Sequence, residues 1–312
     1  MVSCLKWMLV VLSCFLFLLG GANLIEAATS GSHYPLGCEG VMAATVPPPG
    51  FYYRSYLMWY NPTTLNDNNG DELDIGFNTD VFAIANRFVW VAKTNLLGGA
   101  DYAFDMVVPV SDVDVTIDAL GVSDSKSLSL GDICVQPLSL AWHKPRWDAA
   151  FALAVLAPTG EYDADKPASP GLGYWSGLLT IGGTFYFDQE KSWSISALTR
   201  TLAHTEQTDK NVTPGSEFLV EYGVGKQFPV NEKLLMRPGV AGYAYWQIED
   251  DSDDGPGTIA DERKEVYALG AEINFFWLPQ TNFQMNIRAL REFGAKNTTQ
   301  GSKIVLTITK GW

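Results

Sequence analysis

Eight charged side chains stand in the middle of segments in which apolar and polar residues alternate. All eight fall on the polar parity of their segments, and the two signs are mixed. If that parity lines a channel, these side chains would form a constriction that orients a passing solute. The other interpretation is a set of ion pairs and hydrogen bonds that fills the interior of a closed sheet. The eight are Arg54, Arg87, Asp105, Arg200, Glu221, Arg237, Glu272 and Arg288.

A second candidate site is the stretch that precedes the first alternating segment, residues 29–50 (TSGSHYPLGCEGVMAATVPPPG). It is rich in Gly, Ala and Pro and carries little charge. Disordered tails are usually more charged and less apolar, so this composition favours a plug-like segment inside a barrel. A periplasmic leader without fixed structure is the other interpretation. The side chains that would line a path for a hydrophobic ligand are His33, Tyr34, Val41, Met42 and Val46.

An acidic stretch, residues 249–263 (EDDSDDGPGTIADER), holds seven carboxylates. The spacing of Asp250, Asp251 and Asp253 weakly resembles the start of a calcium loop, but no glutamate completes that loop in the required frame. The stretch therefore favours a solvated surface loop with no bound metal. A weaker form of the metal hypothesis is that this acidic loop shares divalent cations with lipopolysaccharide phosphates at the outer rim.

Enzymatic chemistry has little support in the sequence. The chain has 3 His, no glycine-rich phosphate loop and no Cys/His zinc spacing. Ser139 and His143 share a strand face, as an outer-membrane acyl hydrolase would need, but no orienting carboxylate or carboxamide is evident. We expect neither an enzyme nor a cofactor. The net charge of −14 argues against nucleic acid as a partner.

The elements that position these side chains are strands. Twelve aromatic-rich segments alternate apolar and polar residues, and the connectors between them alternate between long polar loops and short turns. Short turns at one rim and long loops at the other are typical of an outer-membrane barrel, with both chain ends at the short-turn rim. The segments are residues 51–61, 79–92, 100–110, 131–143, 147–157, 175–187, 193–204, 216–228, 234–248, 264–277, 282–293 and 302–312.

The last segment shows why the sheet should close. Ile304, Leu306, Ile308 and the terminal Trp312 share one parity, so the chain ends in a strand with an apolar face. A strand edge cannot stand unpaired in lipid, so this segment should pair with residues 51–61. Pro137 lies inside another segment and predicts a bulge there.

The first 28 residues are typical of a signal peptide, with a basic start at Lys6, an apolar run over residues 7–21 and small residues near Ala27. That run is shorter than the roughly 20 residues of a spanning helix, which is the other interpretation. Cys38 and Cys134 remain after cleavage; a disulfide between them and two free thiols both stay open.

Several stretches together resemble a known family. They are HYPLGCEGVMAATVPPPGFYYRSY (residues 33–56), GADY (99–102), GDI with Pro137, LAPTGEY (156–162) and GVAGYAYWQ (239–247). They resemble the outer-membrane proteins of the meta-pathway of phenol degradation, the SphA-like transporters. The resemblance implies a barrel that passes hydrophobic or aromatic compounds and supplies no catalytic residues.

We therefore predict an all-β, closed, antiparallel up-and-down transmembrane barrel of about 12 strands. Residues 1–28 would be the signal peptide, 29–50 the plug-like segment and 51–312 the barrel. The expected function is passive uptake of hydrophobic or aromatic small molecules through the outer membrane of a Gram-negative bacterium, in contact with lipid and lipopolysaccharide. The alternatives are a sealed structural or adhesive barrel that acts through its long outer loops, and the acyl hydrolase.

Overall fold

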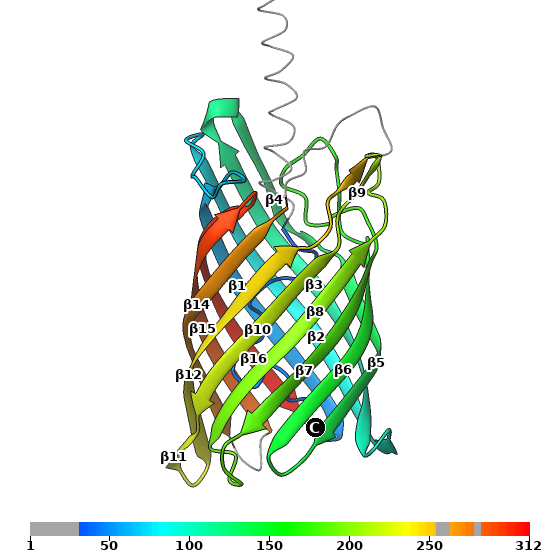
Figure 1. Ribbon diagram of the computed structural model, residues 1–312, viewed down its shortest axis with the longest axis vertical. Coiled ribbons are helices and arrows are strands. Elements are labelled where there is room, and N and C mark those ends of the chain that lie inside the picture. The colour runs from blue at the N-terminus through cyan, green and yellow to red at the C-terminus, as the bar shows by residue number, and fades with distance from the viewer. Residues whose placement is uncertain (1–30, 254–262, 278–281) are drawn as a thin grey trace, which may run out of the picture.

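The computed structural model describes residues 31–253, 263–277 and 282–312, and shows one tall barrel of tilted strands (Figure 1). The predicted signal peptide, residues 1–28, and most of the acidic stretch, residues 254–262, lie outside the described residues. Within the described ranges, no helix is long and apolar enough to cross a bilayer.

Twelve strands form a closed antiparallel ring, as predicted. The main sheet has 14 strands, of which β4 (Val122–Leu130) and β11 (Phe228–Asn231) are only appended to neighbours, which leaves twelve in the ring. β16 pairs with β1 through Leu57 and Leu306, and β10 pairs with β12, so no strand edge is left open. The ring consists of β1 (Gly50–Leu65), β2 (Phe77–Leu96), β3 (Ala100–Ile117), β5 (Ile133–His143), β6 (Trp147–Ala157), β7 (Ser176–Tyr186), β8 (Trp193–His204), β10 (Glu217–Lys226), β12 (Leu234–Gln247), β14 (Glu265–Trp277), β15 (Phe283–Lys296) and β16 (Thr299–Gly311).

The parity of the ring strands separates an outer apolar face from an inner face that carries the polar and charged side chains together with buried apolar ones. On β16, Ile304 is 49% exposed, whereas its neighbours Lys303 and Val305 are buried. On β8, Ile195 is 48% exposed, whereas Ser196 is buried. Successive strand side chains point to opposite faces, and a closed wall in lipid needs its apolar side outside.

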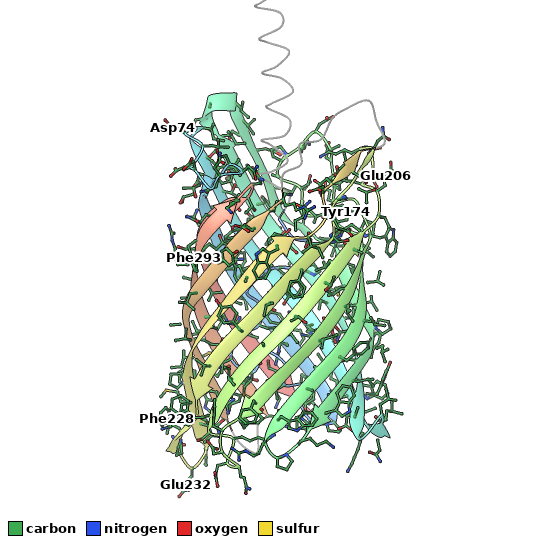
Figure 2. All side chains as sticks on the ribbon, in the orientation of Figure 1. Asp74, Tyr174, Glu206, Phe228, Glu232 and Phe293 are labelled. Atoms are coloured by element: carbon green, nitrogen blue, oxygen red, sulfur yellow. The ribbon has the colours of Figure 1, made fainter. Side chains whose placement is uncertain are left out.

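Aromatic side chains gather near both rims of the wall. At the short-turn rim, the rings of Phe51 and Trp312 are 5.9 Å apart, beside the junction of the first and last strands. At the long-loop rim, Tyr267 contacts both Trp246 and Phe293. Figure 2 shows Phe293 near the long-loop rim and Phe228 near the opposite one. Amphipathic rings favour the two interfaces of a bilayer, so these bands mark its depth.

One predicted loop is wrong. Residues 111–130 were expected as a long polar connector, but β3 continues to Ile117, a short 3₁₀ helix (Asp118–Leu120) follows, and β4 returns along β3. The reason is an apolar cluster beyond the ring, in which Val115 and Ile117 pack with Phe77 and other buried side chains. This hairpin rises above the long-loop rim (Figure 1). The bulge expected at Pro137 is confirmed, since the β5–β6 register shifts between Val135 and Leu138.

Residues 31–49, called the N-terminal segment below, run through the barrel from rim to rim. Ser32 donates a hydrogen bond to Glu217, the first residue of β10 after a long loop. Thr45 donates to Asp148, which lies next to a short turn at the start of β6. Both ends of the ring lie at the short-turn rim, as predicted. The prediction that the chain also begins at the short-turn rim concerns residues outside the described ranges; the first described residues, with Ser32, lie at the opposite rim.

Candidate functional site

A cavity of about 380 Å³ lies in the lumen between the N-terminal segment and the inner faces of β1, β2 and β3. Most of the side chains that these strands contribute are apolar, and they follow the strands toward the long-loop rim. Pro167 and Pro170 of a long loop reach the same cavity. The strand residues include Met58 on β1, Val81, Ala83 and Ala85 on β2, and Val107, Val113 and Val115 on β3.

The N-terminal segment lies against the opposite wall, β8 to β15, which is called the polar wall below because its charged and hydroxyl side chains bind the segment. Apolar side chains of the same strands, such as Leu202 and Leu219, form a cluster against which Tyr34 and Leu36 pack. Arg288 donates to the carbonyl oxygen of Gly37 at 2.7 Å, and Val41 N donates to Glu272 Oε2 at 3.0 Å. Ala44 N donates to Ser196 Oγ at 3.2 Å. The lumen is therefore divided: the segment is bound to the polar wall of β8 to β15 and covers most of it, whereas the apolar side chains of β1 to β3 face the cavity.

Glycines in the polar wall let the segment approach closely. A Cβ atom at Gly223 on β10 would lie 2.6 Å from Val41 N and 2.8 Å from the carbonyl carbon of Gly40. One at Gly40 would lie 2.0 Å from Glu272 Oε2. Carbon atoms normally keep a distance of about 3.5–4.0 Å, so these positions accept only hydrogen. The glycines form a seat for the turn at residues 40–45.

Three of the eight predicted lumen charges meet at one end of the cavity, around a carboxylate that sequence reasoning missed. Arg87 binds Asp105 through two nitrogens, at 3.0 and 3.1 Å. Arg54 and Arg87 both approach Glu39 Oε1, at 3.5 and 3.4 Å. Tyr56 donates to the same oxygen at 2.7 Å. Glu39, in the N-terminal segment, thus supplies a counter-charge for two arginines of the barrel wall.

Four more of the predicted charges form two buried ion pairs across the polar wall. Arg200 pairs with Glu221, and Arg288 Nε donates to Glu272 Oε2 at 2.8 Å. Both pairs are almost fully buried, with side chains at most 7% exposed. Each carboxylate also binds the N-terminal segment, Glu221 through Tyr34 and Glu272 through Val41. These pairs fill the interior and anchor the segment, as the second interpretation of the lumen charges describes; the constriction that orients a solute stays a prediction.

Arg237 lies apart from the other seven. It donates to the carbonyl oxygen of Lys191 at 3.0 Å and to Gln227 Oε1 at 2.8 Å, and both partners belong to short turns. Its guanidinium also lies over the ring of Phe276, 5.7 Å from the centroid. Arg237 therefore braces the short-turn rim.

The five predicted lining residues of the N-terminal segment divide into two groups. His33 and Tyr34 line the cavity, together with Leu36 and Cys38, which were not predicted. Val41 sits instead on the glycine seat, and Val46 packs against Val89 and Val91 at the barrel wall. Met42 belongs to the turn, where its carbonyl oxygen accepts from Thr45 N at 3.0 Å.

A second missed group surrounds Lys303 on β16. Its ammonium donates to the carbonyl oxygen of Leu36 at 2.9 Å and lies 4.4 Å from the ring centroid of Tyr60. Glu292 lies 3.8 Å away and accepts from Tyr60 at 2.8 Å. One signal could have found Glu39: it is the only carboxylate among residues 31–50 and faces strands with arginine at their centres. No comparable pattern marks Lys303.

The weaker predicted sites are placed as follows. Asp250 binds Arg263 through two oxygens, at 2.7 and 2.8 Å, and Asp251 accepts from Gly215 N at 2.7 Å. Asp253 lies in β13 (Ser252–Asp253), which pairs with β9 (Val212–Thr213). In the described part of the chain, no group of three His, Cys, Asp or Glu side chains could hold a metal ion. Both Cys38 and Cys134 are free thiols.

The predicted hydrolase pair is not assembled. Ser139 is 3% exposed and faces the interior, whereas a pair on the outer wall was required. Four residues of strand separate Ser139 from His143, a distance of about 13 Å. His143 instead approaches Asp148 Oδ1 at 3.3 Å.

Comparisons with known proteins agree with this architecture. A crystal structure of an outer membrane channel from Pseudomonas putida F1 matches with a TM-score of 0.73 at 15% identity, over 89% of this chain and 100% of that chain. The beta domain of the Bordetella autotransporter BrkA matches with a TM-score of 0.51 at 9% identity, over 84% of this chain and 99% of that chain. The barrel fold is thus that of Gram-negative outer-membrane proteins.

Sequence comparison decides the family. No curated protein matches the chain. The model of one family, described as the putative MetA-pathway of phenol degradation, matches residues 63–308, which is more than half of the chain. The chain belongs to this phenol-degradation family.

Proposed function

We propose that the protein is a passive channel through which small hydrophobic or aromatic molecules cross the outer membrane. The divided lumen carries this proposal. A water-filled porin has a polar lumen, whereas here the open half is lined by Met58, Val81, Val107 and similar side chains. An apolar surface inside a barrel costs free energy when it is wet, so its occupant should be an apolar solute.

The size of the cavity agrees with such a solute. An apolar cavity of about 150 Å³ is large enough for benzene, and this one measures about 380 Å³. A substituted single ring would fit, together with polar contacts at the end where Arg87 and Asp105 lie. The Pseudomonas putida protein with the same barrel fold is an outer membrane channel, which supports the same function.

The N-terminal segment would act as the plug of this channel. It fills the polar half of the lumen and leaves the apolar half as the route. The outward apolar side chains of the wall would contact lipid, and the outer rim would contact lipopolysaccharide. Nothing in this route consumes energy, so transport would follow the concentration gradient.

The proposal is tested by a substitution that narrows the cavity without removing any side chain that holds the barrel wall together. Ala85→Trp places an indole in the cavity, whereas Ala289→Trp places the same side chain on the exposed outer face of β15. Both variants are produced in a porin-deficient Gram-negative strain, and uptake of radiolabelled toluene by intact cells is measured. We expect uptake to fall several-fold in Ala85→Trp and to be unchanged in Ala289→Trp. If wild type and empty cells take up toluene equally, the protein is a sealed barrel and the proposal is wrong.

A further inference from the structure

Two histidines flank one serine at the long-loop rim. Ser176 Oγ, at the start of β7, lies 2.7 Å from His33 Nδ1 and 2.6 Å from His204 Nδ1. His33 belongs to the N-terminal segment, and His204 is the last residue of β8. Ser176 is 1% exposed, so no bulk water competes for these contacts. We call these three residues, with Asp132 and Glu217, the rim cluster.

The outer nitrogen of each imidazole faces a carboxylate. His33 Nε2 lies 3.0 Å from Asp132 Oδ2, and His204 Nε2 lies 3.4 Å from Glu217 Oε1. Burial raises the pKa of Asp132, but hydrogen bonds from His33 and from the backbone N–H groups of Leu172 and Gly160 outweigh it and leave this pKa below its ordinary value. The Asp132 carboxylate therefore acts as an acceptor, and Glu217 accepts a hydrogen bond from Ser32.

The other groups that face the cluster bring no positive charge. The ring of Tyr174 meets both imidazoles edge-on, with centroids 5.1 Å apart in each case. Ser32 donates to Glu217, and the Tyr245 hydroxyl also bonds to that carboxylate. Among the described residues, no lysine or arginine forms an ion pair with Asp132 or Glu217. In the described part of the chain, the charge that compensates these carboxylates can therefore come only from the imidazoles.

A count of protons follows from these contacts. Ser176 has a single hydroxyl proton, which it donates to one Nδ1, so the other Nδ1 must donate to its oxygen. The two Nε2 atoms are buried without another hydrogen-bond partner and lie 3.0 and 3.4 Å from carboxylate oxygens, so an unprotonated nitrogen there would face negative charge and both need a proton. Three N–H groups are required on two rings, and two neutral rings carry only two. The arrangement is complete only when one ring is an imidazolium.

We propose that the rim cluster binds this one additional proton and that the proton fastens the N-terminal segment to the barrel at its outer end. His33 is the segment's contribution to the cluster. When the imidazolium loses this proton, a lone pair on one ring nitrogen faces the lone pairs of a carboxylate or of the serine oxygen. The contact between that nitrogen and that oxygen then becomes repulsive. The hold on residues 31–36 then weakens as pH rises. Because His33 also lines the cavity, the same event alters its outer mouth. The cluster is a pH-sensitive latch at the edge of the cavity, and His33 and Asp132 belong to both.

The first test counts the protons. The chain has 3 His, so the ¹⁵N NMR spectrum of the histidine-labelled protein in micelles holds three rings, assigned with His33→Gln, His143→Gln and His204→Gln. At neutral pH we expect one doubly protonated ring within the cluster and one neutral ring with its proton on Nε2. His143 serves as the reference outside the cluster. Two neutral rings at every pH from about 5 to 9 would overturn the proposal.

The second test measures the latch itself. Hydrogen exchange of residues 31–36, corrected for intrinsic rates, should accelerate about tenfold as pH rises past the loss of the imidazolium signal, the change expected when a hydrogen bond to a charged group is lost. Ser176→Ala should remove this pH dependence. Should that variant fail to fold, the wild-type titration decides alone. A flat exchange profile in the wild type refutes the latch, whatever the protein transports.

Discussion

The glycine seat makes Gly223→Ala the sharpest probe of the N-terminal segment. The added Cβ would lie 2.6 Å from Val41 N, 2.8 Å from the carbonyl carbon of Gly40 and 2.9 Å from Val41 Cα. All three are backbone atoms of the segment, and none belongs to the barrel. Relaxed contacts need about 3.5–4.0 Å, so the segment would have to shift by roughly 1 Å.

That shift also breaks a hydrogen bond. Val41 N donates to Glu272 Oε2 at 3.0 Å, and a displacement of this size carries the pair beyond bonding range. Overpacking costs about 1–3 kcal/mol, and a lost hydrogen bond to a charged group costs about 1.5–3 kcal/mol. The sum, about 2.5–6 kcal/mol, raises the unseated fraction of the segment at least about sixtyfold.

Hydrogen exchange of residues 37–45 in micelles measures this change, and Gly177→Ala is the matched control. Gly177 lies on β7, faces outward, and has no atom within 4 Å of its added Cβ. Replacing a strand glycine by alanine gains up to about 1 kcal/mol from the backbone alone, and the control carries the same gain. If the two variants exchange at the same rate, the segment does not rest on β10 and the reasoning is refuted.

Two further predictions concern buried charge. Arg288→Met leaves Glu272 without its partner, and we expect unfolding in urea, followed by tryptophan fluorescence, to lose about 3–5 kcal/mol. Adding Glu272→Gln should restore most of that loss, and equal losses in the single and double variants would contradict the pairing. Asp132 has a lowered pKa, so its contribution is present above the ordinary value of 3.8 and is lost as pH falls below it. The amides of Gly160 and Leu172, which donate to Asp132, should therefore be less protected from hydrogen exchange below pH 3.8 than at neutral pH, after correction for intrinsic rates. Asp132→Asn should abolish this pH dependence.

The barrel could be predicted from sequence because its rules are local. Each strand repeats with a period of two, and the terminal strand with Ile304 and Ile308 on one face needed a partner in lipid. The β3–β4 hairpin escaped prediction because Val115 and Ile117 are buried against Leu65, Phe77 and Ala168, which come from three separate stretches of the chain. Because residues 118–126 are mostly polar, the sequence did not indicate β4, which pairs with the extension of β3.

The interior was harder to predict because parity says which face a residue takes but not its neighbour across the lumen. Arg54 and Arg87 were correctly placed inside, yet their shared partner Glu39 comes from a segment with no period at all. The rim cluster joins His33 to residues about a hundred or more positions away, which only the closed ring brings together. Val41 was expected to face a ligand, but it packs against glycines of the barrel wall instead. Nothing in the sequence distinguishes these glycines from the others.

A barrel that encloses its own beginning restricts the order in which it can assemble. The N-terminal segment leads directly into β1, the strand that must meet β16. Once that seam forms, residues 31–49 are enclosed by the complete wall. We therefore expect this segment to enter as the seam closes, because a segment left outside would have to pass a folded turn through a finished ring.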